Sequence, residues 1–229
     1  MKTKLCLAAL VLILVLSGKG YSQTESIQTT WKFDKTGSMG GYETTPLTRF
    51  PVIIDTDRGK AFLFNGIDQA MLIGGNPLGN ASSFTIEILF RPDSSLNPAN
   101  LEQRFLHVAK TKDEKPRILM ELRLLKNQRW ALDTYIGSDS SSSTLLDTVN
   151  PGKLHPAGRW YHVALVFENK TITNYINGKV EHSDKVDFLP LPDAIISVGA
   201  RQNPRSWFKG VIKTVRFTKR ALKPNEFLK

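Results

Sequence analysis

The sequence predicts an all-β fold in which short antiparallel strands form a sandwich or barrel. Short runs of β-branched and aromatic residues recur along the chain, separated by Gly, Pro, Asn and Asp. Residues 158–183 predict a three-strand meander, with a polar turn at residues 168–170 and Asn177-Gly178 at the second, tight turn. After removal of an N-terminal leader, 207 of the 229 residues remain, which suits one all-β domain with a sizeable core.

The sequence pattern of the N-terminal part of the chain indicates few strands. Residues 29–34 alternate as a strand does and would begin a sheet. Residues 35–58 contain Gly37, Gly40, Gly41, Pro46 and Pro51, so we expect mostly loop there, with at most one short strand around residues 52–54. Residues 59–66 and 67–73 follow this loop.

The middle of the chain alternates between an apolar and a polar face. Strands are expected at residues 83–92, 104–109, 117–124 and 129–136, and the serine run at residues 138–143 predicts a loop. We expect the apolar faces to be buried between two antiparallel sheets, which would bury Phe84, Ile86, Ile88, Phe90, Ile118, Met120, Leu122, Trp130 and Leu132.

The C-terminal third begins with the meander. Its first strand, residues 160–167, is apolar on both alternating faces, which is typical of a central strand covered on both sides.

Several short motifs carry a family resemblance. Residues 160–164 read Trp-Tyr-His-Val-Ala, residues 175–179 read Tyr-Ile-Asn-Gly-Lys, residues 83–92 read Ser-Phe-Thr-Ile-Glu-Ile-Leu-Phe-Arg-Pro, and residues 220–227 read Arg-Ala-Leu-Lys-Pro-Asn-Glu-Phe. These motifs resemble signatures of laminin-G-like domains of the concanavalin A-like lectin/glucanase superfamily. The resemblance covers residues 29–229 and implies a two-sheet antiparallel jelly-roll β-sandwich. It also implies strands at residues 59–66, 195–200 and 208–217 and a closing helical turn at residues 220–227.

The N-terminus predicts a secretory signal peptide over residues 1–22. Lys2 and Lys4 precede an apolar run that is too short to span a bilayer, and Gly20 and Ser22 fit a cleavage site. An uncleaved anchor is the alternative. The single cysteine, Cys6, lies in this leader, so the mature chain would contain no disulfide. We expect residues 23–229 to form one domain that is secreted, periplasmic or at the cell surface, with no membrane span after cleavage.

The chain is basic, with a formal net charge of +10. The leader holds three lysines and no acidic residue, so 28 of the 31 basic residues remain against 21 acidic ones, a net charge of +7. In an exported protein this charge favours polyanionic partners such as sulfated or uronic-acid glycans, or an anionic cell surface. Solvated lysines that serve solubility are the alternative. No nucleic-acid-binding motif is present, so we expect no nucleic-acid partner.

Catalysis has to be judged residue by residue, because the superfamily also contains glycoside hydrolases and polysaccharide lyases. The Glu-x-Asp-x-x-Glu strand of its retaining glucanases, which places two carboxylates on one face, is absent. Residues 120–123 are similar to an alginate-lyase strand. However, His107 precedes that strand instead of following it, and the acid-base tyrosine is missing. We therefore assign no catalytic residue.

A metal site is not favoured by the sequence. His107, His155, His162 and His182 show no metal-ligand spacing, and His162 fits a hydrogen-bonded core histidine. Many laminin-G-like domains bind calcium, but Lys213 stands where the family often has Asp, and Asn65 also replaces an Asp. Losing a carboxylate and adding an ammonium disfavours a hard cation, so we expect no cofactor, including calcium.

A carbohydrate-binding surface remains, formed by polar side chains on outward strand faces and nearby loop residues. Arginine suits carboxylate and sulfate groups, and an aromatic ring suits a sugar face. The candidate ligand-binding residues are Glu87, Arg91, Glu121, Arg123, Asp133, Tyr135, Arg201, Arg205 and Trp207. Glu87 and Arg91 join the set if their strand lies in the same sheet as the others.

The sequence therefore predicts a secreted, non-catalytic module that binds carbohydrate, with an acidic polysaccharide as the favoured class. A glycoside hydrolase or polysaccharide lyase of the same fold is one alternative, and a protein-adhesion module is another. The candidate face has a structural alternative as well, because the same charges could form cross-strand ion pairs on a solvated sheet.

Overall fold

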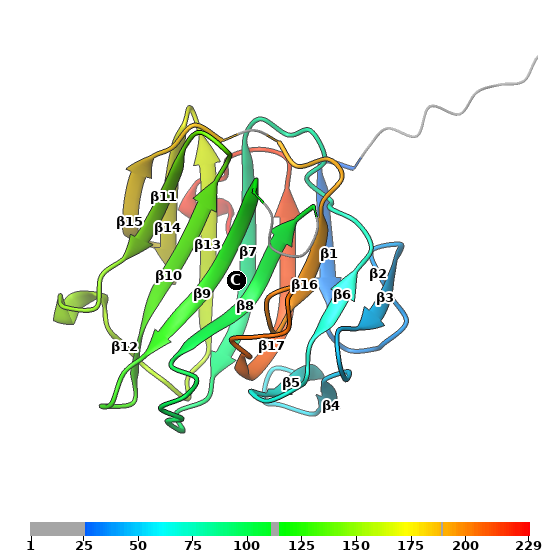
Figure 1. Ribbon diagram of the computed structural model, residues 1–229, viewed down its shortest axis with the longest axis vertical. Helices are drawn as coiled ribbons and strands as arrows, with labels where there is room; N and C mark the ends of the chain where they lie inside the picture. The colour runs from blue at the N-terminus through cyan, green and yellow to red at the C-terminus, as the bar shows by residue number, and fades with distance from the viewer. Residues whose placement is uncertain (1–25, 111–114, 189) are drawn as a thin grey trace, which may run out of the picture.

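The computed structural model describes residues 26–110, 115–188 and 190–229. The described strands form two antiparallel sheets packed face to face, which confirms the predicted jelly-roll β-sandwich (Figure 1). The signal peptide expected at residues 1–22, with Cys6, lies outside the described residues. No helix within the described part of the chain has the length and apolarity needed to cross a bilayer.

The back sheet of Figure 1 has the strand order β15-β14-β13-β7-β17-β5-β4, with β1 paired to β17. Its strands are β1 (Gln28–Lys32), β4 (Val52–Ile54), β5 (Ala61–Asn65), β7 (Phe84–Pro92), β13 (Tyr161–Glu168), β14 (Thr171–Ile176), β15 (Lys179–Lys185) and β17 (Lys209–Thr218). The predicted meander is β13-β14-β15. Positive φ angles at Asn169-Lys170 and Asn177-Gly178 form its two tight turns.

The front sheet has the order β11-β10-β9-β8-β16-β6-β3-β2, with β12 paired to β10. Its strands are β2 (Ser38–Met39), β3 (Tyr42–Pro46), β6 (Met71–Ile73), β8 (Glu102–Ala109), β9 (Arg117–Leu124), β10 (Arg129–Gly137), β11 (Ser142–Leu146), β12 (His155–Pro156) and β16 (Ile195–Val198). Two 3₁₀ turns, η1 (Pro151–Lys153) and η2 (Pro224–Glu226), complete the described elements.

The core lies between the sheets and contains every side chain that the alternation places there. All nine predicted core residues are buried, from Phe84 to Leu132. Phe90 occupies the centre, with its ring stacked on Phe105 at 4.9 Å between centroids and edge-on to Trp130 at 5.4 Å. These contacts join β7 of the back sheet to β8 and β10 of the front sheet.

The C-terminal segment covers the outer face of the back sheet. Leu222 and Phe227 pack on Ala164 and Val166 of β13 in a small second apolar cluster. This cover explains why β13 is apolar on both faces.

The prediction of a loop at residues 138–143 is partly wrong, because Ser142 begins β11, which pairs with β10. Pairing and the burial of alternate side chains override the weak strand preference of serine there.

Candidate functional site

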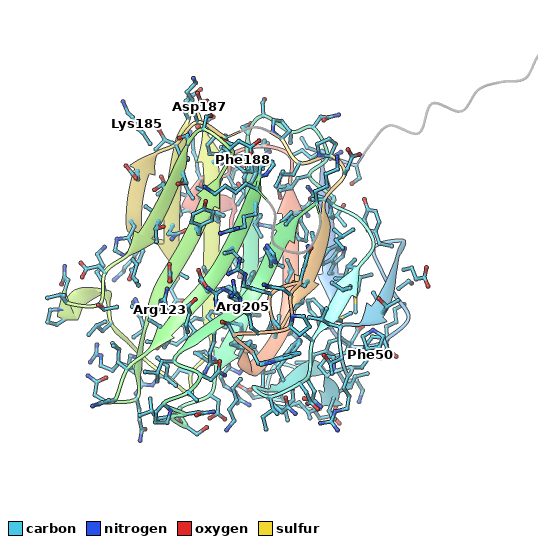
Figure 2. All side chains as sticks on the ribbon, viewed as in Figure 1. Phe50, Arg123, Lys185, Asp187, Phe188 and Arg205 are labelled. Atoms are coloured by element: carbon cyan, nitrogen blue, oxygen red, sulfur yellow. The ribbon has the colours of Figure 1, made fainter. Side chains whose placement is uncertain are left out.

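A pocket of about 610 Å³ opens beside β8 and β9, next to the loop that follows β16. Four arginines dominate its wall, and Glu102 is the one acidic side chain among the described residues that line it. The lining residues are Ala99, Asn100, Leu101, Glu102, Arg104, Arg123, Arg201, Arg205 and Ser206. Figure 2 shows Arg123 and Arg205 together over the middle of the front sheet.

The strand side of the pocket is set by the register of β8 against β9. Arg104 stands opposite Glu121, so both side chains share the outward face. A β-bulge at Phe105 then shifts the alternation: Phe105 turns into the core, while His107 returns to the outward face beside Arg104. The bulge therefore gives this short stretch two outward polar residues, with apolar residues between them.

The loop side depends on a sharp exit from β16. Gly199 has a φ of +95°, and a methyl group at this position would overlap the Phe64 ring, so glycine is required. Phe208 N donates to Gly199 O at 2.8 Å and closes the loop. Arg104 N donates to Ser206 O at 2.9 Å, which brings the loop back onto β8.

His107 and Gln202 fix the loop to the sheet. Gln202 N donates to His107 Nδ1, and Gln202 Nε2 donates to the carbonyls of Ala109 and Ile195. Burial, followed by the charges of three nearby arginines, lowers the pKa of His107 to about 3. The imidazole is therefore neutral at physiological pH, and its Nδ1 serves as a hydrogen-bond acceptor for the loop.

Buried carboxylates hold two of the four arginines. The Nε of Arg104 lies 2.7 Å from Glu121 Oε2, and the Nε of Arg123 lies 2.7 Å from Asp133 Oδ2. Glu102 pairs with both arginines at the pocket surface. Glu121 is 3% exposed and Asp133 is fully buried, so these two carboxylates lie beneath the guanidinium groups.

The remaining positive charge is concentrated in a small volume. Burial, followed by the charges of Arg104 and Arg205, lowers the pKa of Arg201 to about 10. The pKa of Arg104 is also lowered, first by burial and then, against the opposing effect of Glu121, by Arg123 and Arg205. The arginines therefore repel one another in a partly desolvated pocket, and a bound anion would relieve that repulsion.

Six of the predicted site residues lie on or beside this face. Arg123, Arg201 and Arg205 line the pocket. Glu121 and Asp133 sit opposite each other on β9 and β10, below the lining. Tyr135 shares their face, and the Arg117 guanidinium lies 4.7 Å from its ring centroid, so the two stack beside the pocket and do not line it.

Trp207, predicted as an aromatic platform, is half-buried and does not line the pocket. Its backbone forms an isolated parallel β-bridge with Arg104, and its carbonyl accepts a hydrogen bond from Asn100 Nδ2 at 2.7 Å. A role for the Trp207 ring in ligand binding stays a prediction.

Glu87 and Arg91 do not join the other residues, which corrects the predicted set. Both lie on β7, in the middle of the back sheet, and point to its outer face. Glu87 is fully buried there, beneath the C-terminal segment. It accepts hydrogen bonds from Leu228 N at 2.7 Å and His162 Nε2 at 3.0 Å, and it pairs with Arg216. Its role is to hold the C-terminal segment on the sheet.

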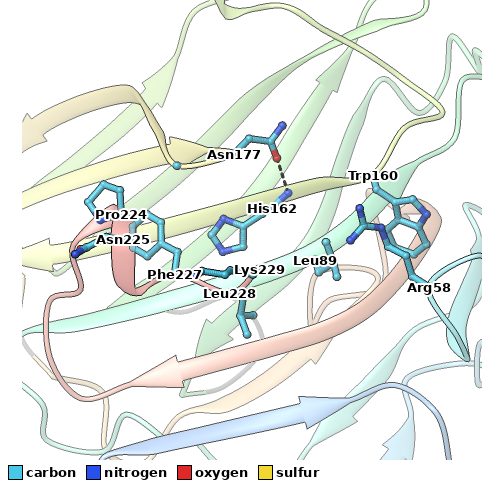
Figure 3. A pocket seen from close by; sticks show the side chains of 11 residues that line it. Arg58, Leu89, Trp160, His162, Asn177, Pro224, Asn225, Phe227, Leu228 and Lys229 are labelled. Carbon is cyan, nitrogen blue, oxygen red and sulfur yellow. Dashed lines mark hydrogen bonds between the residues drawn. The ribbon is translucent and has the colours of Figure 1, made fainter.

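A second pocket of about 320 Å³ lies on this outer face of the back sheet. In Figure 3 the Trp160 ring and Arg58 stand at one end, Phe227 and Pro224 at the other, and His162 and Leu89 between them. Arg91 and Arg58 both lie near the Trp160 ring, at 5.3 and 5.9 Å from its centroid. Asp57 accepts the indole N–H at 2.9 Å. These contacts indicate that the Trp160 side chain packs at the rim of the sheet.

Four polar residues of the pocket were missed by sequence reasoning, namely Asn100, Glu102, Arg104 and Ser206. Arg104 was recognised as part of a strand, but a strict two-residue alternation does not anticipate the bulge at Phe105. Ser206 could have been found, because it lies between two candidate residues of the same short loop, Arg205 and Trp207.

The described residues contain no group of three or more His, Cys, Asp and Glu side chains that could hold a metal ion. Asn65 Oδ1 caps a turn by accepting backbone N–H groups of residues 67–69, and its Nδ2 donates to Asp68 at 2.7 Å. Lys213 Nζ donates to the carbonyl of Arg58. The absence of a calcium requirement stays a prediction.

Comparisons with solved structures agree with the fold. Domain 4 of an extracellular arabinanase from Geobacillus stearothermophilus, in complex with arabinotriose, has a TM-score of 0.64 at 20% identity, covering 86% of this chain and 94% of the domain. The botulinum neurotoxin serotype G binding domain has a TM-score of 0.58 at 15% identity, covering 86% of this chain and 49% of the other. A Trypanosoma rangeli sialidase in complex with the inhibitor DANA has a TM-score of 0.55 at 15% identity, covering 86% and 31%.

Sequence comparisons establish the family. None of the curated proteins compared with the chain matches it. A laminin-G profile, described as the concanavalin A-like lectin/glucanases superfamily, matches residues 65–227. These residues include β7 to β17 and the loop that carries Arg201 and Arg205. The chain belongs to the concanavalin A-like lectin/glucanases superfamily.

Proposed function

We propose that this protein is a secreted, non-catalytic module that binds an acidic carbohydrate in the pocket lined by Arg104, Arg123, Arg201 and Arg205. The observation that carries the proposal is the convergence of four guanidinium groups around one acidic lining residue, Glu102. The pKa of Arg201 is lowered first by burial and then by the charges of Arg104 and Arg205, so the positive form of Arg201 is disfavoured in this pocket. A ligand that brings negative charge would offset this effect.

The chemistry of the pocket favours carboxylate or sulfate groups on a sugar. A guanidinium group presents a planar fork of donors that matches either anion. Asn100 and Ser206 add an amide and a hydroxyl, which suit the sugar hydroxyls. The fold is shared with an arabinanase domain in complex with arabinotriose, and this likeness supports carbohydrate as the class of ligand.

The burial of the two carboxylates supports binding over hydrolysis. A general acid or base must come within hydrogen-bond reach of the reacting atom. Glu121 and Asp133 lie below the arginines and do not line the pocket. The adhesion alternative would use the exposed apolar residues of β4 and β5, namely Val52, Ile53 and Leu63.

A binding experiment tests the proposal. Residues 23–229 are first screened on a glycan array with and without a chelator. Isothermal titration calorimetry then compares tetragalacturonate, a heparin tetrasaccharide and the neutral sugar maltotetraose. We expect the acidic ligands to bind and maltotetraose not to bind. Arg205→Ala, which changes an exposed lining residue, should weaken binding at least tenfold, or about 1.4 kcal/mol. The affinity should also fall as salt rises.

The matched control is Arg159→Ala, which removes an exposed arginine before β13 of the back sheet. It changes the net charge equally and should leave the affinity unchanged. Equal losses in Arg205→Ala and Arg159→Ala would indicate nonspecific attraction to a basic protein. Unchanged binding by both Arg205→Ala and Arg123→Ala would show that the ligand binds elsewhere.

A further inference from the structure

Two buried carboxylates lie directly beneath the arginine pocket. Glu121 on β9 and Asp133 on β10 are cross-strand partners, at 3% and 0% exposure. The Arg104 side chain contacts Glu121, and the Arg123 side chain contacts Asp133. Since both arginines also line the pocket, each of them would be shared between a buried carboxylate and a ligand anion.

Charged and titratable groups lie near this pair on three strands and on the loop after β16. The groups are Glu102, Arg104 and the neutral His107 on β8, Arg117 and Arg123 on β9, Tyr135 on β10, and Arg201 and Arg205 on the loop. Positive groups are in excess around the pair. Even so, the two carboxylates remain close to each other and shielded from water, which disfavours ionisation of both.

Both carboxyl groups therefore bind a proton more readily than an ordinary exposed carboxyl group. Burial, followed by the charge of Asp133, raises the pKa of Glu121 to about 7. Burial likewise raises the pKa of Asp133, despite its bond to Arg123. Within the described part of the chain, Asp133 Oδ1 is buried and accepts no hydrogen bond. An oxygen without donors is poorly stabilised as an anion, which agrees with a carboxyl group that accepts a proton readily.

We propose, on the basis of the acidic-carbohydrate site above, that ligand and proton bind together. The ligand anion engages Arg104 and Arg123, and the Glu121–Asp133 pair takes up one proton from solvent. The proton forms an O–H bond on the carboxylate that loses its contact with an arginine, and this carboxyl group becomes neutral. The pair thus makes the affinity of the pocket depend on pH.

The direction follows from the competition for the arginines. At pH 8.5 Glu121 is mostly ionised and holds the Arg104 guanidinium, so the ligand binds weakly. At pH 5.5 Glu121 is protonated and Arg104 is available to the ligand, which binds tightly. Uronate and sulfate groups stay ionised across this range. If the ligand raises the pKa of Glu121 by about one unit, the affinity at pH 5.5 exceeds that at pH 8.5 roughly tenfold.

The test measures tetragalacturonate and heparin tetrasaccharide binding by calorimetry at pH 5.5, 7.0 and 8.5. Titrations at pH 7.5 in phosphate and in Tris, whose ionisation enthalpies differ, report proton uptake by the wild-type protein without any variant. Glu121→Gln should bind at every pH with the affinity that the wild type has at pH 5.5. Glu168→Gln, an exposed carboxylate at the end of β13, is the matched control and should keep the wild-type pH profile.

The outcomes separate the two proposals. No binding at any pH would overturn the carbohydrate site and the coupling with it. Binding with the same affinity from pH 5.5 to 8.5 and no proton uptake would overturn the coupling alone. Retention of the wild-type profile by Glu121→Gln would do the same, because the titrating group would then lie elsewhere. Should Glu121→Gln unfold, the wild-type proton uptake decides the question.

Discussion

Glu87 offers a quantitative test of how the C-terminal segment is held. It is fully buried at the centre of the back sheet, between Ala164 of β13 and Arg216 of β17. The Glu87→Gln substitution keeps the size of the side chain but removes the charge that pairs with Arg216. The amide oxygen can still accept a hydrogen bond from Leu228 N or His162, whereas the new NH₂ group faces donors that it cannot satisfy.

The expected loss of stability follows from the burial of the pair. Removing one partner of a buried ion pair costs about 3 to 5 kcal/mol. The Arg216 side chain is 12% exposed, so it regains some hydration, and we expect the lower end of this range. For a domain of this size, about 3 kcal/mol corresponds to a decrease in Tm of roughly 6 to 12 °C.

Urea unfolding followed by tryptophan fluorescence measures the change in the free energy of unfolding. Hydrogen exchange should show faster opening of residues 220–228 in Glu87→Gln, because the Glu87 contact to Leu228 N is weakened. Glu168→Gln, at an exposed position, should change stability by less than about 0.5 kcal/mol. A loss below about 1 kcal/mol for Glu87→Gln would refute the view that this network holds the segment.

The same network sets a pH dependence in the acid range. Although burial alone raises it, the pKa of Glu87 is lowered overall by hydrogen bonds from His162, Arg216 and Leu228. A carboxyl group with a depressed pKa stabilises the fold above its unfolded value, and that contribution is lost as the pH falls through the folded value. The wild-type protein should therefore lose part of its stability below about pH 4.5, and Glu87→Gln should lose less.

Two further predictions concern the pocket loop and metal. Gly199→Ala should destabilise the fold by at least about 2 kcal/mol in urea unfolding, because the methyl group strains a positive-φ residue and overlaps the Phe64 ring. Gly37 also has a positive φ, but the space around it is open. A smaller loss of stability in Gly37→Ala than in Gly199→Ala would therefore measure the effect of the overlap with Phe64. Chelation should leave the Tm unchanged, whereas a calcium ion at 100 times its Kd would add about 2.7 kcal/mol, so a clear drop in Tm would contradict the expectation from Lys213.

Local pattern was enough to predict several long strands and their buried faces, but it missed β2 and β3, which lie in the expected loop at residues 35–58, and the start of β11. The expected strand at residues 117–124 coincides with β9, and β7 begins at Phe84 and ends at Pro92 as the motif indicates. In both strands one face is continuously apolar. A one-residue slip would expose that whole face, so the sequence specifies the register strongly.

Sheet membership could not be predicted from the same pattern. Alternation states which side chains of a strand point away from the core, but both sheets of a sandwich have an outward face. Glu87 and Glu121 therefore looked equivalent in the sequence, and only the strand order separates them, since β7 lies in the back sheet and β9 in the front sheet. Likewise, the alternation did not reveal that the C-terminal segment covers Glu87, because that contact joins residues far apart in sequence.

The two carboxylates show how the surroundings, and not burial alone, decide what a buried acid can do. Glu87 and Glu121 are both nearly inaccessible, yet the pKa of Glu87 is lowered and that of Glu121 is raised. Glu87 receives hydrogen bonds from a backbone N–H, an imidazole and a guanidinium, so its charge is fully stabilised and fixed in place. Glu121 shares Arg104 with Glu102 and faces Asp133, so its charge is stabilised only in part. A carboxylate of the first kind stabilises the fold, whereas one of the second kind can exchange a proton when a ligand competes for its arginine.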